Sequence, residues 1–70
     1  MNISAINKRN EIYQTIVKYQ KENGFPPSVR NLCILVNIKS TASVHNHLAK
    51  LEKDGLIKIR KNTSRGIQML

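Results

Sequence analysis

Residues 40–54, STASVHNHLAKLEKD, decide the fold of this chain, and a glycine follows them directly. Ser40 is a typical N-cap residue, because its side-chain oxygen can accept a hydrogen bond from a free N–H of the first helical turn. Val44, Leu48 and Leu51 then recur at i, i+4 and i+7, which is the period of a helix with one narrow apolar stripe. The stretch therefore predicts a helix that buries one side and leaves the rest free.

The face opposite this stripe is short, polar in its first half and basic in its second. It lacks the Glu–Lys pairs that usually cover a merely solvated face. A face that enters a DNA groove needs small residues for close approach and a few side chains that can form hydrogen bonds with base edges. We therefore expect this helix to read DNA, and Gly55 to end it in a left-handed conformation. The residues on this face and its flanks are Ala42, Ser43, His45, Asn46, Ala49, Lys50 and Lys53.

The charge balance of the chain indicates a polyanionic partner. Its 70 residues contain 12 Lys and Arg against 4 Asp and Glu, which gives a formal net charge of +8. DNA, RNA and anionic membranes all attract such a charge, but no apolar run approaches the length of a spanning segment. We expect a single domain over residues 1–70. Because the N-terminus has no apolar segment of signal-peptide length, we expect a cytoplasmic protein.

No catalytic or metal-binding constellation is visible in the sequence. His45 and His47 are two residues apart on the predicted helix, so they face different ways and cannot easily share a metal ion. Cys33 is the only cysteine and cannot form an internal disulfide. The three glycines are far apart, so no glycine-rich phosphate loop is present. We expect no enzyme activity, no cofactor and no metal.

Two further helices are predicted before residue 40. The first begins at about Ser4 or Asn7 and ends at Asn23, and the two prolines at 26–27 cannot continue it. Ser28 can cap the second helix. The apolar face of the first helix is expected to comprise Ile12, Tyr13, Ile16 and Val17, with Gln20 beside them. The stripe of the second is expected to comprise Val29, Leu32, Cys33 and Val36.

The second and third predicted helices form a helix-turn-helix, and strands follow. Asn37 tolerates a positive φ, so it suits the short turn between the two helices. After Gly55, apolar and basic residues alternate, and a turn-rich basic segment at 61–66 precedes a second apolar run. The predicted fold class is α+β, a three-helix winged helix-turn-helix whose wing is a C-terminal two-stranded β-hairpin at residues 56–70.

Four blocks of this sequence resemble the LexA repressor family, in that family's order and at its spacing. The family patterns are G-[YFM]-P-P-[ST]-x-R, S-x-x-x-V-H-x-H-L-x-x-L in the recognition helix, [KR]-x-G-[LV]-I, and S-R-G-I in the wing. Any one of these motifs is weak, but four in register cover nearly the whole chain. The matching residues are Gly24 to Arg30, Ser40 to Leu51, Lys53 to Ile57 and Ser64 to Ile67.

The resemblance implies sequence-specific binding of double-stranded DNA at a palindromic operator, and repression of SOS genes that respond to DNA damage. It implies that bases are contacted by early outward residues of the third helix, namely Ala42, Ser43, His45 and Asn46. It also implies that Ser40 and Thr41 lie near phosphate, and that the helix end and wing contact the backbone through Lys53, Arg60, Lys61 and Arg65. Lys39 and Lys50 flank the reading helix and are expected to add to these backbone contacts.

The sequence departs from the family's pattern in three respects. Family repressors carry a second domain that dimerises and cuts the chain at an Ala-Gly bond, whereas this sequence has no Ala-Gly dipeptide and ends at the wing. We therefore expect a chain without that self-cleaving domain. Asn37 stands where the family has glycine, and Ile34 and Leu35 stand where it is usually polar. The last two, with Val36 and Ile38 nearby, predict an apolar patch for a second copy or another protein, unless the Met1-Asn2-Ile3 arm covers it.

Three functions stay open on the sequence alone. The first is a DNA-binding repressor, acting as a homodimer on DNA. The second is a winged-helix module that binds a protein partner or antagonises a full-length repressor, and the third is non-specific nucleic-acid binding. A polar, shaped helix face favours the first over the third. For His47 a half-buried structural role is favoured over a base contact, for His45 the reverse, and for Asn46 solvation and an adenine contact are equally open.

Overall fold

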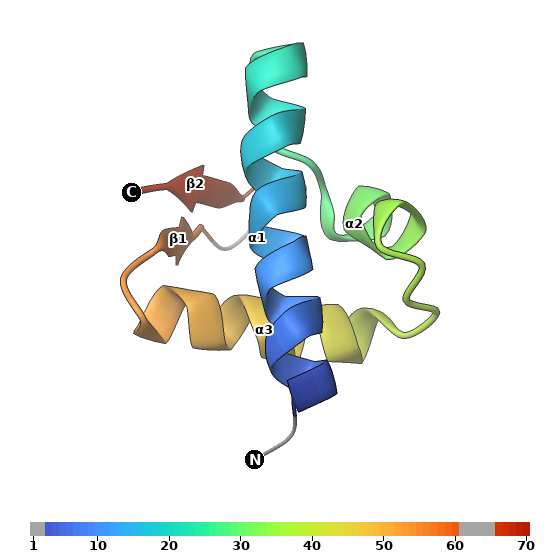
Figure 1. Cartoon of the computed structure of the whole chain (residues 1–70). Helices are drawn as coiled ribbons and strands as arrows, with labels where there is room; N and C mark the ends of the chain where they lie inside the picture. The colour runs from blue at the N-terminus through green and yellow to red at the C-terminus, as the bar shows by residue number, and fades with distance from the viewer. Residues whose placement is uncertain (1–2, 61–65) are drawn as a thin grey trace.

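The computed structural model of this chain describes the backbone of residues 3–60 and 66–70, with side chains from residue 7 onward. Three helices are followed by two antiparallel strands, in which Lys58 lies opposite Gln68 (Figure 1). The elements are α1 (Ile3–Asn23), α2 (Val29–Leu35), α3 (Thr41–Lys53), β1 (Ile57–Ile59) and β2 (Ile67–Met69). The predicted fold class, α+β with a helix-turn-helix and a two-stranded wing, is confirmed.

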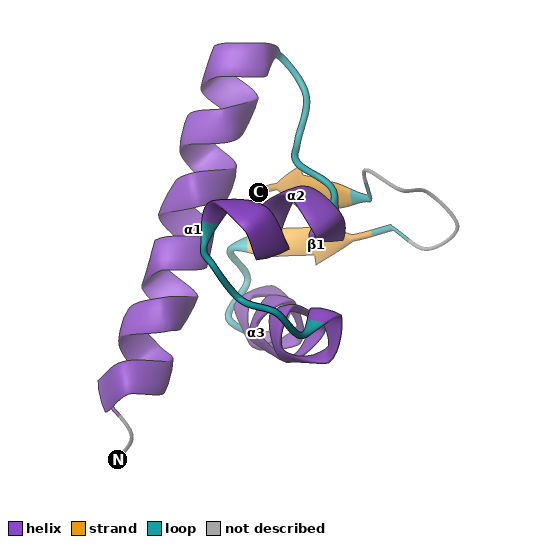
Figure 2. Cartoon of the chain, turned by 90° about the vertical axis from the view of Figure 1, so that its right-hand side faces the viewer, coloured by secondary structure: helices purple, strands orange, loops and turns teal. Residues whose placement is uncertain are grey.

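Helix α1 is the longest element and crosses the rest of the molecule. It spans 21 residues and begins at Ile3, one residue before the earlier of the two predicted starts. Its N-terminal half passes α3, as both views show (Figures 1 and 2). Ile12 and Ile16 are fully buried, but Val17 is 36% exposed. The prediction that Val17 shares the buried face was wrong, because it lies about 100° further round the helix than Ile16.

The two helices of the helix-turn-helix end in the same hydrogen-bonded closure. After α2, Asn37 has a φ of 56°, and the next N–H along the chain donates to the carbonyl of Cys33 at 2.9 Å. After α3, Gly55 has a φ of 80°, and the next N–H donates to the carbonyl of Leu51 at 3.1 Å. Both are Schellman closures, in which a left-handed residue reverses the chain and satisfies free carbonyls. The predicted turn residues Asn37 and Gly55 are confirmed.

Serine side chains begin both of these helices, as predicted. Ser28 Oγ accepts a hydrogen bond from the N–H of Asn31, and Asn31 Oδ1 accepts one from the N–H of Ser28, both at 3.1 Å. This reciprocal pair is a capping box. Ser40 Oγ accepts from the N–H of Ser43 at 3.4 Å. Seven residues are too few for α2 to persist alone, so its caps and its packing hold it.

One apolar core lies where the helices and the sheet meet. The whole predicted stripe of α3 is buried in it, and Cys33 packs half-buried against its edge, as expected of a small core residue. The strands contribute alternate residues, so the side chains of Lys58 and Gln68 stay exposed. The buried hydrophobic side chains that form this core are Ile12, Ile16, Leu32, Val36, Val44, Leu48, Leu51, Ile57 and Ile67.

A carboxylate fixes the sheet against α3. The N–H of Ile59 donates to Glu52 Oε2 at 2.8 Å. Hydrogen-bonding directions alternate along a paired strand, so this N–H faces away from β2 and would otherwise be a free edge donor. Helix α3 therefore holds β1 both through the closure at Gly55 and through this side chain.

The strands of the wing are shorter than the predicted range of 56–70. Leu56 belongs to the closure of α3 rather than to β1, which begins one residue later. Its carbonyl still accepts the N–H of Leu70 at 3.2 Å, so the ladder extends one pair beyond the strands. Of the predicted turn at 61–66, residues 61–65 lie outside the described part of the chain.

We expect Glu52→Ala to lower the free energy of unfolding by about 1 kcal/mol, because it leaves the Ile59 N–H without its acceptor. Glu52→Gln removes the same charge but keeps an oxygen acceptor, so it should cost clearly less. Urea denaturation of the three proteins measures both changes. Equal losses for the two variants would mean that net charge, and not this bond, carries the effect.

Candidate nucleic-acid interface

Helix α3 lies at one side of the molecule with its outward face uncovered. In Figure 2 it is seen nearly end-on, below the sheet and α2. The exposed positions are the ones predicted from the helical period, and their side chains are small or polar. Of the four predicted base-reading residues, Ala42, His45 and Asn46 are exposed and Ser43 is half-buried.

The start of α3 offers several groups to an anion. Lys39, Ser40 and Thr41 are all exposed there. Ser40 Oγ accepts the cap bond from Ser43, which leaves its hydroxyl hydrogen available to donate. The first turn of α3 contains no acidic residue, so nothing neutralises the partial positive charge of the helix N-terminus. These groups together can hold a phosphate oxygen.

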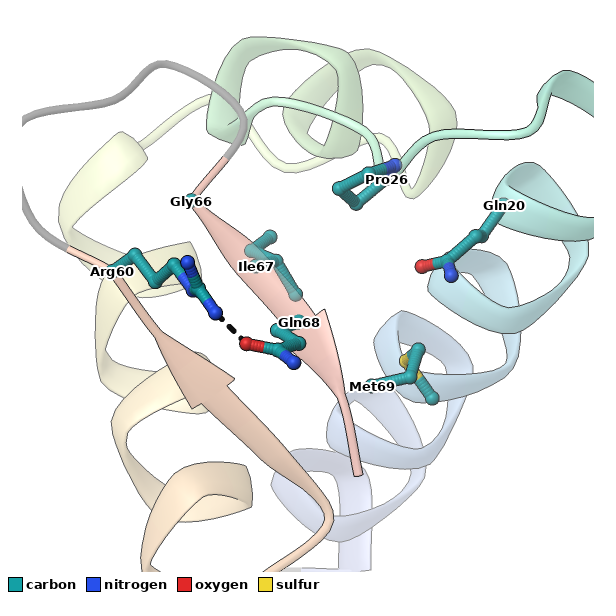
Figure 3. A pocket seen from close by; sticks show the side chains of 7 residues that line it. All are labelled: Gln20, Pro26, Arg60, Gly66, Ile67, Gln68 and Met69. Carbon is teal, nitrogen blue, oxygen red and sulfur yellow. Dashed lines mark hydrogen bonds between the residues drawn. The ribbon is translucent and has the colours of Figure 1, made fainter.

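The end of α3 and the wing add cations. Lys50 and Lys53 are exposed in the last turn of α3, and Arg60 is exposed just after β1. Arg60 Nε donates to Gln68 Oε1 at 3.0 Å, so its guanidinium is held across the sheet (Figure 3). Lys58 is exposed two residues before Arg60; it was not among the predicted DNA contacts, although the strand alternation places it on the same face as Arg60. Two other residues that were predicted to contact the DNA backbone, Lys61 and Arg65, lie outside the described residues.

An open groove of about 510 Å³ lies between β2 and the C-terminal half of α1 (Figure 3). Gln20 Oε1 is buried there, and no described residue forms a hydrogen bond with it. Among the described residues that line it, Arg60 alone is charged, and none of them forms the paired acid, base or nucleophile of a catalytic site. The lining residues are Gln20, Pro26, Arg60, Gly66, Ile67, Gln68 and Met69.

Metal and membrane sites find no support in residues 3–60 and 66–70. No group of three or more His, Cys, Asp or Glu side chains within these ranges is placed to hold a metal ion. Among the helices that the structure describes, none combines the length and the apolar character that crossing a bilayer requires.

His47 lies where α1 passes α3 and is half-buried, as the sequence favoured. Burial lowers the pKa of His47 below its usual value, and the positive charges of Lys50, Arg9 and Lys8 lower this pKa further. Lys8 and Arg9 are themselves half-buried, although the predicted apolar face of α1 did not include them. They precede the buried Ile12 by four and three residues, and that spacing was the available signal.

Lys8 is already engaged within the fold. Its Nζ donates to the carbonyl of Val36 at 3.0 Å and to the carboxylate of Glu11 at 2.9 Å. Val36 is the C-cap of α2, where a cation is favoured by the helix dipole. Lys8 therefore acts as a clamp between α1 and α2.

The predicted apolar patch is confined to two residues of α2. Ile34 is 78% exposed and Leu35 is 52% exposed. Val36, expected close by, is instead buried in the core, because it follows the stripe of Leu32 by four residues. The Met1-Asn2-Ile3 arm was the alternative cover for this patch. Ile3 is already part of helix α1, and Met1 and Asn2 lie outside the described residues. Leu35 faces α1 across a shallow pocket lined by Thr15, Lys18, Tyr19 and Glu22.

This chain is similar in sequence to repressors of one family. The family model described as LexA DNA binding domain matches residues 6–66. The chain is 50% identical over all 70 residues to a LexA repressor of Clostridium botulinum (strain Hall), of which it covers 35%. It is 47% identical over 70 residues to the LexA repressor of Clostridium novyi (strain NT), of which it covers 34%. The chain thus spans about a third of the length of these relatives.

We expect the protein to lose stability as the pH falls from 7.5 to 5.5, because of His47. Its folded pKa lies below the ordinary 6.5, so the unfolded chain binds the proton first. The contribution of His47 to the free energy of unfolding is fully present above pH 6.5, and it is lost as the pH falls through the pKa of the folded state. Urea denaturation across this range measures the slope.

The matched variants are His47→Gln, which should flatten this slope, and His45→Gln, which changes an exposed histidine of the same helix and should preserve it. If His47→Gln keeps the full slope, another group controls the pH dependence.

Proposed function

This chain belongs to the LexA DNA-binding domain family, and on that basis we propose that residues 1–70 act as a sequence-specific DNA-binding domain of a transcriptional repressor. The observation that carries the proposal is the uncovered face of α3, where small and polar side chains lie between basic groups. Its target would be double-stranded operator DNA of the SOS type, in the cytoplasm where bacterial DNA lies. Binding there would block transcription.

In the proposed complex, α3 enters the major groove, which is wide enough for a helix. Ala42 permits close approach and can contact a thymine methyl, while Asn46 can form two hydrogen bonds to adenine. Ser43 and His45 offer further polar tips to base edges. Phosphate contacts would fix the register of these base-contacting residues on the DNA without carrying sequence information. They would come from Lys39, Ser40, Thr41, Lys50, Lys53, Arg60, Lys61 and Arg65.

The proposed operator is palindromic, and two copies of the domain would read its halves. A single helix of 13 residues covers only part of one major-groove face. Joining two such contacts makes the second one intramolecular, so it raises affinity without any new kind of contact. A role limited to binding a protein partner is not favoured, because the family match includes the reading helix and most of the wing.

The first test is salt dependence. If about four cations meet phosphates, the slope of log affinity against log salt should be about −3.6, since each phosphate contributes about −0.9. Fluorescence anisotropy with an operator duplex measures this slope, and a scrambled duplex of equal length serves as the control. An affinity that stays constant between low and physiological salt would rule out backbone contacts.

The second test separates base reading from phosphate contact. Asn46→Ala should weaken operator binding by about 1–3 kcal/mol and hardly affect scrambled DNA, because it removes a base contact. Lys53→Ala, an exposed change on the same helix, should weaken both duplexes alike. Both variants should keep unfolding free energies within about 0.5 kcal/mol of the wild type. Equal effects of Asn46→Ala on the two duplexes would show that Asn46 reads no base.

A further inference from the structure

We propose that α1 and α3 together form a second phosphate-binding site on the DNA interface, made by Arg9, His47 and Lys50, and that His47 takes up a proton when a backbone phosphate binds there. The inference rests on the proposed DNA-binding function. It adds Arg9 and His47 to the contacts considered above, and it makes affinity depend on pH.

The site lies on the flank of α3 that faces away from the wing. Figure 2 shows the N-terminal half of α1 on one side of α3, while the C-terminal end of β1 and the N-terminal end of β2 lie toward the other side. His47 and Lys50 are three residues apart, so they share one flank of α3. Glu52, which binds β1, lies on the opposite flank. The proposed site and the described basic residues of the wing therefore lie on opposite sides of the outward face of α3. Contacts to the two phosphate backbones that border one groove require such an arrangement.

The basic side chains of this site have no counter-ion among the residues that the structure describes. Arg9 and His47 are half-buried, yet within the described residues neither side chain forms a hydrogen bond or an ion pair, and the side chain of Lys50 is also unpaired there. The neighbouring carboxylate, Glu11, is bound to Lys8 at 2.9 Å. Buried charged side chains are usually paired, and like charges held together repel one another. An anion would remove this repulsion, and a DNA phosphate is the anion that lies along such a flank.

The protonation of His47 gives the site a signature that a general basic surface lacks. In the free protein, burial and the charges of Lys50, Arg9 and Lys8 lower the pKa of His47, so the imidazole is neutral near pH 7. A phosphate beside it reverses the sign of the local field and favours the imidazolium. The ring then binds one proton from solvent and has two N–H donors, of which one can serve the phosphate. Operator affinity should therefore rise as the pH falls, by at most tenfold per pH unit for one proton.

The direct test is NMR titration of the His47 ring in the full chain, free and bound to an operator duplex. The free ring should titrate below 6.5 and the bound ring above it, with His47→Gln identifying the signal. Inorganic phosphate at millimolar concentration should give a much smaller shift. A bound ring that still titrates below 6.5 would overturn the proposal, and an equal shift with inorganic phosphate would overturn its assignment to DNA.

Arg9→Gln provides the independent test, with Lys21→Gln as its matched control at the exposed far end of α1. Arg9→Gln should reduce the magnitude of the salt slope by about 0.9, and Lys21→Gln should leave it unchanged. Arg9→Lys should restore it, which excludes a folding defect. If the wild type binds no DNA, the proposed function fails. If it binds and these three variants have equal slopes, only the phosphate site fails.

Discussion

Burial of one narrow stripe of α3 is the constraint on which the rest of this structure depends. Val44, Leu48 and Leu51 are all within the core, covered by α1, α2 and the sheet. Because the stripe is narrow, the other positions of the helix are free of packing demands. The same burial that stabilises the domain thus fixes which side of α3 faces outward. A wider apolar stripe would have required more cover and left less of the helix to contact a partner.

Two of the four carboxylates of the chain, Glu11 and Glu52, form hydrogen bonds within the fold, so they do not neutralise the lysines of α3. Glu11 binds Lys8, and Glu52 binds the edge of β1. Within the part of the chain that the structure describes, the exposed Lys50 and Lys53 of α3 therefore have no ion-pair partner, which raises the positive potential on this side. The cost is mutual repulsion, which the fold tolerates in the half-buried group around His47. The same charges that favour a polyanion lower the stability of the free domain there. A bound phosphate would remove the repulsion between them.

Local features of this protein follow from its sequence because each is decided within a turn of chain. Ser28 and Ser40 cap their helices through atoms three residues away, and Asn37 and Gly55 reverse the chain by their own backbone preference. The buried stripe of α3 follows from helical period alone. The family, the fold class and the outward face of α3 could therefore be predicted.

Only the tertiary structure decided how the elements sit against one another, since a helical period gives a face but neither a crossing point nor a neighbour. It brought Arg9 of α1 to His47 of α3, which are far apart in sequence, and it turned Lys8 into a clamp on α2. It likewise bound Glu52 to Ile59. These contacts join separate elements, so no stretch of sequence contains both partners in a pattern that could be recognised. The sequence determined which helix faces outward, and the packing of the other elements determined which charges flank it.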